Sequence, residues 1–347
     1  MEVTDRSEQG NGTFNESVVD SIATPVVPLM SHTELQVALT CIFSLAIPVC
    51  IFGLCSNVVN IIVFYRMGFS IPTNISLFCL AIADWLTLAI TTVVVFGEHP
   101  ALQNANLIMS MRDVNFTIAV AYPGVSAMGS WITAVINVER ACCIAFPMKV
   151  KRIFTRKTVV CLIVGMVIYQ IVSGLPRSFA MTLKMITSPV TNRTIVVLID
   201  MDQGVLLQSF FFSYSIPTFL CFSIVVVGTI FLVRKFKQSR QMRASMTRTE
   251  KESDKISDKD LILIRSVIFI CVVYIIGVTP NILISIASGI HPRMKMNDPY
   301  FGYFANALVA IGNFFQAISC SVNIFLYFRM GSRFKKTVKQ IFLCNSN

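Results

Sequence analysis

The stretch SWITAVINVERACCIAFPMKVKRIF, residues 130–154, decides the fold class of this chain. It starts as an apolar run of helical character, places a carboxylate beside a guanidinium at Glu139 and Arg140, and continues into a basic tail. Such charges are costly inside a bilayer, but long side chains at the end of a span reach the polar interface. The stretch therefore predicts a transmembrane helix that leaves the membrane near Arg140.

The composition of the whole chain agrees with a membrane protein. Among 347 residues, 54% are hydrophobic and only 14% are charged, whereas a soluble domain carries about 25% charged residues. We therefore expect an all-α membrane protein, a seven-transmembrane helix bundle, because seven apolar runs reach the roughly 20 residues that span a bilayer. The runs are Val37–Phe64, Thr73–Phe96, Val114–Ala141, Val159–Leu175, Val205–Val233, Leu261–Ser288 and Phe301–Phe328.

The distribution of lysine and arginine predicts the orientation. The loops after the first, third and fifth runs, together with the C-terminal tail, hold 20 of the 29 basic residues. Because basic residues are enriched on the cytoplasmic side, we expect an extracellular tail at residues 1–36, a membrane domain at 37–328 and a cytoplasmic end at 329–347, in the plasma membrane. The net charge of +11 then faces anionic lipid and does not indicate nucleic-acid binding.

Three segments between and after these runs have patterns of their own. Residues 328–344 repeat apolar side chains at helical spacing opposite lysines, which predicts a short amphipathic eighth helix on the inner leaflet. Residues 179–200 carry two β-branched runs around Ser-Pro-Val-Thr-Asn, which predicts a hairpin lid on the outer side. Residues 234–260 are polar and of mixed charge, so we expect either a flexible loop or a helical extension of the neighbouring runs.

Several residues are candidates for covalent modification. Sequons on the outer side stand at Asn11, Asn15 and Asn192, with a further match at Asn115. Cys344, just past the amphipathic segment, is a candidate for palmitoylation. The eleven cysteines show no Cys-x-x-Cys pattern and the three histidines fall near the outer surface, so we expect neither a metal centre nor an enzyme.

Polar residues inside the apolar runs are the first candidates for a functional site. Asp84 lies near the middle of the second run, where an ionisable group costs roughly 2.5–3.5 kcal/mol on insertion scales. Asn57 and Asn323, in the first and seventh runs, are expected to meet it across the interior. The alternative is that such residues only hold helices together, at about 1 kcal/mol per hydrogen bond.

The charged pair Glu139–Arg140 also has two interpretations. Both residues lie at the cytoplasmic end of the third run, where they would serve as simple interfacial anchors. In a bundle that opens and closes, Arg140 would instead be tied to an acid of a neighbouring helix in one state and released in the other. Asp260, at the cytoplasmic start of the sixth run, is such an acid.

At these positions the chain resembles the rhodopsin-like (class A) G-protein-coupled receptors, from about Val37 to Cys344. Several short motifs agree with that family in order and spacing. They are Ser56-Asn57, Leu80-Ala81 with Asp84, Glu139-Arg140-Ala141, Pro147, Pro176, Pro217, Pro280 and Asn323-Ile324 with Tyr327. Within the family the local likeness is greatest to divergent invertebrate, lophotrochozoan receptors of the neuropeptide-like and chemosensory kinds.

The resemblance implies a receptor that passes an extracellular signal to a heterotrimeric G protein. Agonists would move the sixth span outward and free Arg140 to line a pocket for the G protein. The implied activation switch comprises Glu139, Arg140, Asp260, Asn323 and Tyr327. The implied intramembrane polar site, where a sodium ion would bind near Asp84, comprises Asn57, Asp84, Ser319 and Asn323.

Departures from the family pattern exclude some classes of ligand. The disulfide between the third span and the second external loop is missing at both ends, with Asn115 at one expected position. Tyr122 stands where amine receptors have an aspartate, which argues against a monoamine. The seventh run contains no lysine for a Schiff base, which excludes an opsin, and Ile324 replaces the usual proline, which predicts a weaker kink there.

The ligand is therefore expected to be an extracellular peptide or a small non-amine molecule. An acidic outer face, formed by Glu98, Asp113, Asp200 and Asp202, would suit a cationic peptide or would merely oppose the positive-inside bias. A transporter is the remaining alternative, although we find no internal repeat. The predicted ligand-binding residues are Thr92, Glu98, Tyr122, Ser126, Ser209, Asn281, Asn313 and Gln316.

Overall fold

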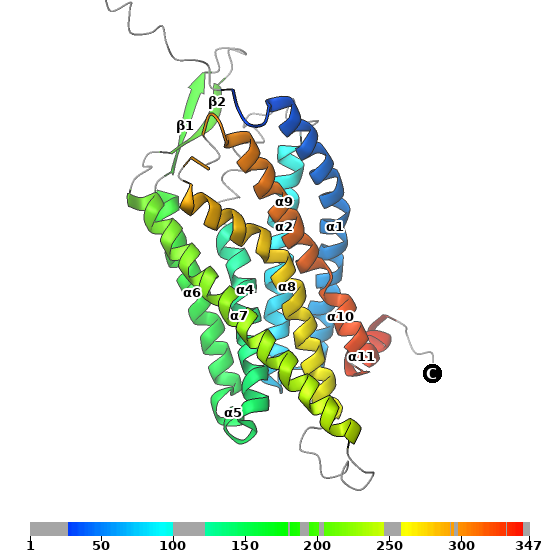
Figure 1. The fold of residues 1–347 in the computed structure, drawn as a ribbon. Helices are drawn as coiled ribbons and strands as arrows, with labels where there is room; N and C mark the ends of the chain where they lie inside the picture. Colours follow the sequence, from blue (N-terminus) through cyan, green and yellow to red (C-terminus); the bar gives the residue numbers. More distant parts are fainter. Residues whose placement is uncertain are drawn as a thin grey trace, which may run out of the picture.

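Long helices packed side by side dominate the structure, a computed structural model (Figure 1). It describes residues 27–99, 122–179, 181–187, 194–200, 205–245, 258–291, 293–294, 298–330 and 332–342. A short β-hairpin lies at one end of the bundle, and the short helices α5 (Pro147–Ile153) and α11 (Ser332–Phe342) lie at the other. We refer to these as the hairpin end and the α11 end.

Helices coincide with all seven apolar runs as far as the structure describes them. The third run is described from Tyr122, and the seventh is divided between two helices at Val322. The long helices are α1 (His32–Met67), α2 (Pro72–Glu98), α4 (Tyr122–Ala145), α6 (Arg156–Phe179), α7 (Val205–Ser245), α8 (Asp258–Ile290) and α9 (Gly302–Ser321), and the short α10 (Asn323–Met330) follows α9.

Six of the apolar segments are long and apolar enough to cross a membrane, and α4 is not among them within the described residues. The reason is its interior face, where Ser126, Ser130, Thr133 and Asn137 precede the charged pair. These side chains are buried because α4 packs against α2, α6, α7 and α8 at once. A helix at the centre of a bundle needs little apolar surface of its own, since its neighbours face the lipid in its place.

The structure describes parts of the two segments for which the sequence predicted a hairpin and a loop or helical extension, residues 179–200 and 234–260. Strands β1 (Met181–Thr187) and β2 (Thr194–Asp200) pair antiparallel, with Met181 opposite Asp200, which confirms the predicted hairpin. Helix α7 continues through Ser245, so residues 234–245 take the helical alternative. The polar stretch between Ser245 and Asp258 lies outside the described residues.

The helix ends follow from local sequence. At the start of α1, the Ser31 hydroxyl accepts a hydrogen bond from the Glu34 backbone N–H at 3.2 Å, and the Glu34 carboxylate accepts one from the Ser31 N–H at 2.8 Å. Such a capping box satisfies backbone donors that have no partner within the helix. At the other end Gly68 adopts a φ of +77°, a conformation that glycine takes without steric cost, and the chain turns there into α2.

The described core runs along the contact of α4, α7 and α8. Ile136, Val225, Leu232 and Val267 have 0–1% of their surface exposed, and they form one cluster with residues of α1, α2 and α11. Leucines, isoleucines and phenylalanines on the outer faces of the helices are exposed instead, as expected where lipid is the solvent. Phe334 of α11 joins the core, where it contacts Phe64 and Tyr327 at ring-centroid distances of 5.5 and 5.6 Å.

Candidate functional site

The charged pair at the α11 end is buried. Arg140 and Glu139 are 8% and 4% exposed, and Nη2 of Arg140 lies 2.7 Å from Oε1 of Glu139. The hydroxyl of Thr73, at the start of α2, accepts a hydrogen bond from Nη2 of Arg140 and donates one of 2.7 Å to Oε1 of Glu139. Adjacent charges on one helix are thus joined through a neighbouring helix.

Sequence reasoning missed Thr73, the second residue of α2, although it is the first residue of the predicted second apolar run. Asp260 lies on α8, but its side chain is outside the described part of the structure, so the predicted tie between Asp260 and Arg140 stays a prediction. Among the described residues, Nε of Arg140 and Oε2 of Glu139 have no hydrogen-bond partner. The site therefore keeps polar capacity for a further group.

A second polar site lies deeper, around Asp84. Nδ2 of Asn323 donates to Oδ2 of Asp84 at 2.7 Å, which agrees with the expectation that these residues meet. Asn57 was expected to meet Asp84 as well, but its amide donates instead to the backbone carbonyls of Gly53 and Cys320, both at 3.0 Å. Asn57 thus joins α1 to the end of α9, because the small Gly53 lets the two helices approach closely.

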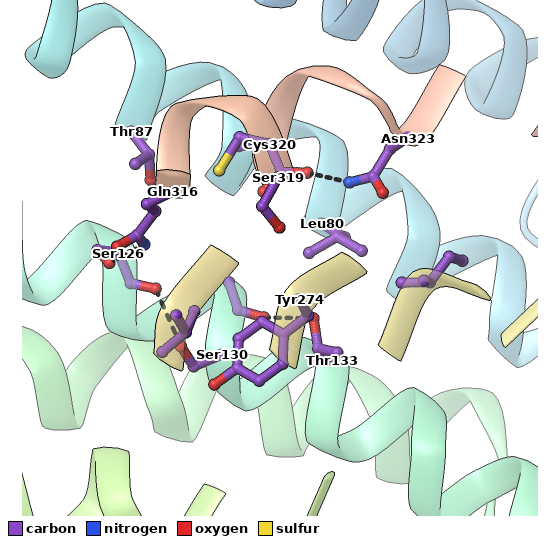
Figure 2. A pocket seen from close by; sticks show the side chains of 14 residues that line it. Leu80, Thr87, Ser126, Ser130, Thr133, Tyr274, Gln316, Ser319, Cys320 and Asn323 are labelled. Carbon is purple, nitrogen blue, oxygen red and sulfur yellow. Dashed lines mark hydrogen bonds between the residues drawn. The ribbon is translucent and has the colours of Figure 1, made fainter. Parts of the chain in front are cut away.

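A small cavity of about 30 Å³ adjoins Asp84 (Figure 2). Ser319 lines it and donates to the carbonyl of Val273 at 3.3 Å. The cavity has room for about two water molecules, and its oxygen donors are of the kind that hard cations prefer. The predicted sodium ion stays a prediction, which thermal unfolding in sodium chloride against choline chloride would test: an equal midpoint in both salts contradicts it.

The seventh run breaks at Val322 although Ile324 stands where the family has proline. The residue between α9 and α10 has φ −84° and ψ −7°, and the Phe325 N–H bonds to the Val322 carbonyl at 3.1 Å. We expected only a weak kink. The break is explained by side chains, since Asn323 turns to Asp84 and Ser321 donates to the carbonyl of Val49 on α1 at 3.1 Å.

A larger cavity of about 170 Å³ lies among α4, α7, α8 and α9, on the hairpin side of the Asp84 site. Five of the predicted ligand-binding residues line it together: Tyr122, Ser126, Asn281, Asn313 and Gln316. Thr92 and Glu98 do not line it, and Thr92 donates to the carbonyl of Leu88 within its own helix at 2.7 Å. The side chain of Ser209 lies outside the described part of α7. The predicted residues of α4, α8 and α9 thus meet at one cavity and those of α2 do not line it, while their role in ligand binding stays a prediction.

The floor of this cavity is a chain of hydrogen bonds across three helices. Gln316 of α9 donates to the Ser126 hydroxyl of α4, and it accepts from Nδ2 of Asn281 on α8 at 3.1 Å. Ser126 and Gln316 line both cavities, and Figure 2 shows them at the smaller one. The chain of amides thus separates the large cavity from the small one. Gly312 makes room for it, because a Cβ there would lie 2.1 Å from Oδ1 of Asn281.

Sequence reasoning missed the wall that α7 contributes. Tyr214, Ser215 and Thr218 line the cavity, and Ser285 adds a hydroxyl from α8. Ser215 and Thr218 stand three residues apart beside Pro217 in an otherwise apolar run, a spacing that places both on one helix face. That spacing would have identified them. No side chain that lines the cavity within the described residues carries a formal charge.

Other predicted residues fall where the structure describes nothing. The sequons at Asn11, Asn15, Asn115 and Asn192 and the cysteine Cys344 lie outside the described residues.

Tyr327, predicted as part of the switch, is buried against Phe64 of α1 with a centroid distance of 5.0 Å. Its position brings the end of α10 into the same core as α11.

The comparison with known families agrees with this arrangement. A family model described as serpentine type 7TM GPCR chemoreceptor Srw matches residues 44–345, which include both cavities and the charged pair. No curated protein matches the chain. The matched family is one of chemoreceptors, whereas the finer likeness to rhodopsin-like and lophotrochozoan neuropeptide receptors stays a prediction. Because the match covers most of the chain, the protein belongs to the Srw family of serpentine seven-transmembrane G-protein-coupled chemoreceptors.

Proposed function

We propose that this receptor detects a small, uncharged molecule in the cavity among α4, α7, α8 and α9. The observation that carries the proposal is the chemistry of the lining. The cavity is lined by hydroxyl, amide and apolar side chains, with no formal charge among the described residues. Its volume of about 170 Å³ corresponds to on the order of ten water molecules, which matches a compact ligand.

A cationic peptide is the alternative ligand, and its support is weaker. It would require the acidic outer face of Glu98, Asp113, Asp200 and Asp202, and none of these acids is among the described residues that line the cavity. A charged ligand in a neutral cavity would lose hydration without gaining an ion pair. The likeness to neuropeptide receptors therefore carries less weight here than the cavity itself.

The signal would leave at the α11 end. With the N-terminus outside the cell, the hairpin end faces the ligand and Arg140 faces a heterotrimeric G protein. In this proposal the ligand alters the hydrogen bonds of Gln316 and Asn281, and α8 moves at its Asp258 end. If Asp260 restrains Arg140, Asp260→Ala raises basal nucleotide exchange on the G protein; an unchanged basal rate would remove that role.

The proposal is tested by G-protein nucleotide exchange in membranes that contain the receptor, with a panel of neutral small molecules and a panel of basic amidated peptides. For an active neutral compound, Gln316→Leu should raise the concentration that gives a half-maximal response about tenfold. This factor corresponds to a loss of roughly 1.4 kcal/mol of binding free energy. Asn306→Leu is the matched control. Its amide donates to the Gly302 carbonyl of the same helix at 2.9 Å, and it does not line the cavity.

Two results would contradict the proposal. One is a response to basic peptides alone that Gln316→Leu leaves unchanged, which would move the ligand site to the outer face. The other is an equal loss of response in Gln316→Leu and Asn306→Leu, which would show that the substitution acts on the stability of α9 rather than on the ligand.

A further inference from the structure

An amide at the centre of the bundle joins three helices through one nitrogen. Asn137 of α4 is fully buried, and its Nδ2 donates toward three acceptors. These are the backbone carbonyl of Val225 at 3.2 Å and the hydroxyl of Thr229 at 3.0 Å, both on α7, and Sγ of Cys271 on α8 at 3.0 Å. Cys271 is also fully buried. We call these four residues the Asn137 cluster.

The cluster lies where movement of α8 has to be resisted. Asn137 precedes Arg140 by three residues, so it lies about one helical turn deeper than the charged pair. The described partners of Arg140 belong to α4 and α2, and therefore do not hold α8. Cys271 lies between the start of α8 and Pro280, in the part of the helix that would move if α8 opened at its Asp258 end.

The hydrogen bonds of the cluster are shared and incomplete. A side-chain amide has two N–H donors, and here they serve three acceptors, of which the thiol is a weak one. Oδ1 of Asn137 has no hydrogen-bond partner among the described residues although it is buried. A buried acceptor without a partner disfavours the conformation that contains it. The cluster therefore holds the helices together in a way that is easily reversed.

Close packing keeps the amide in this position. A Cβ added at Gly228 of α7 would lie 1.9 Å from Oδ1 of Asn137, and the two next nearest atoms also belong to that side chain. Glycine at this position is therefore required by the side chain of Asn137 rather than by the backbone. Any larger residue would push the amide away from its three acceptors.

We propose that the Asn137 cluster is an uncharged latch that holds α8 against α4 and α7 in the resting receptor. Opening of the latch releases α8 and lets the unpartnered Oδ1 find a new donor. The latch is a property of helix packing and is independent of the charged pair. Only its effect on G-protein exchange rests on the proposed function.

Gly228→Ala tests the latch without removing any of its polar groups. It should displace the amide and increase hydrogen–deuterium exchange of α8 amides between residues 264 and 272, in purified receptor in lipid nanodiscs. Basal nucleotide exchange on the G protein should rise about fivefold, the factor expected for loss of one net hydrogen bond. Gly165→Ala is the matched control, since a Cβ there meets no atom within 4 Å. Both substitutions give the same gain in helix propensity.

Two substitutions at Cys271 separate the hydrogen bond from packing. Cys271→Ser keeps a stronger acceptor and should leave basal exchange at or below that of the native chain. Cys271→Val removes the acceptor and should raise it, as Gly228→Ala does. Unchanged deuterium exchange in α8 for both Gly228→Ala and Cys271→Val would overturn the latch. If α8 exchanges faster in these variants while no G protein responds to any of them, the latch stands and the proposed coupling fails.

Discussion

At the scale of single residues, the buried pair Glu139–Arg140 is held by a threonine that belongs to another helix. A buried ion pair contributes net stability only when hydrogen bonds satisfy the rest of both groups. Thr73 adds one hydrogen bond to each of the two paired atoms, accepting from Nη2 of Arg140 and donating to Oε1 of Glu139, while Nε and Oε2 keep no partner among the described residues. A hydroxyl suits this place because, unlike an amide N–H, it can do both. The pair therefore depends on the packing of α2 against α4.

Thr73→Val should lower the free energy of unfolding of the receptor by about 1.5–3 kcal/mol, the usual contribution of a hydrogen bond to a charged group. The midpoint of thermal unfolding should fall accordingly. Valine has nearly the shape of threonine, so the loss reports the hydroxyl alone. The measurement is the midpoint of thermal unfolding in detergent or nanodiscs. Thr40→Val is the control, since its hydroxyl only donates to the Gln36 carbonyl of its own helix. Equal losses in the two variants would contradict a special role for Thr73.

At the scale of secondary-structure elements, the start of α9 is fixed by one carboxylate. Asp298 accepts the backbone N–H groups of Tyr300 and Phe301 at 2.8 and 2.9 Å, and Arg293 approaches it at 3.3 Å. The hydrogen bond from the Phe301 N–H is the largest influence on the pKa of Asp298, and together with those from Tyr300 and Arg293 it outweighs the opposing effect of desolvation and holds this pKa below its ordinary value. The carboxylate form is therefore the one that organises the helix start.

This lowered pKa predicts a pH dependence. A group whose pKa is lower in the folded state contributes stability that is complete above its unfolded pKa and is lost as the pH falls through its folded pKa. Asp298→Asn keeps an acceptor for the two N–H groups but cannot titrate. The native receptor should therefore lose more thermal stability than Asp298→Asn when the pH is lowered from 7 to below about 4, near the ordinary aspartate pKa. Parallel pH profiles of the two proteins would show that Asp298 makes no such contribution.

At the scale of the whole molecule, the two ends of the bundle differ in kind. Figure 1 shows the hairpin at one end of the bundle and α11 at the other. The large cavity lies on the hairpin side, whereas the buried pair Glu139–Arg140 and the basic residues of α11 lie toward the α11 end. Membrane proteins keep their basic loops in the cytoplasm. A ligand bound near the hairpin end and a G protein bound at the α11 end would therefore contact the same set of helices.

The orientation can be tested through the sequons. If the N-terminus is outside, the chain produced in cells should carry N-glycans that a glycosidase removes, and the double substitution Asn11→Gln with Asn15→Gln should reduce the resulting mobility shift. A further N-x-S match, Asn74-Ile75-Ser76, is a control from the opposite end of the bundle, where Asn74 is 7% exposed and donates to the Gly68 carbonyl at 3.0 Å. A glycan at Asn74 would contradict the proposed orientation.

Sequence alone determined the position of the helical segments that the structure describes, because apolar length and period are local properties of the chain. It also identified Asp84 and Asn323 as partners, since a carboxylate in an apolar run has few ways to be satisfied. It did not identify the hydrogen bond from Asn57 to Cys320 or the role of Thr73, because both depend on how closely one helix approaches another.

Only the tertiary structure decided which polar residues share a cavity. Tyr214 and Thr218 of α7 face Asn281 and Gln316 from other helices, although no sequence interval relates them. The same holds for the Asn137 latch, whose three acceptors are 88 to 134 residues away from Asn137 along the chain. The bilayer specifies that each segment is a helix, whereas side-chain packing specifies the rotation and separation of those helices. Binding and switching depend on the second, which local sequence does not encode.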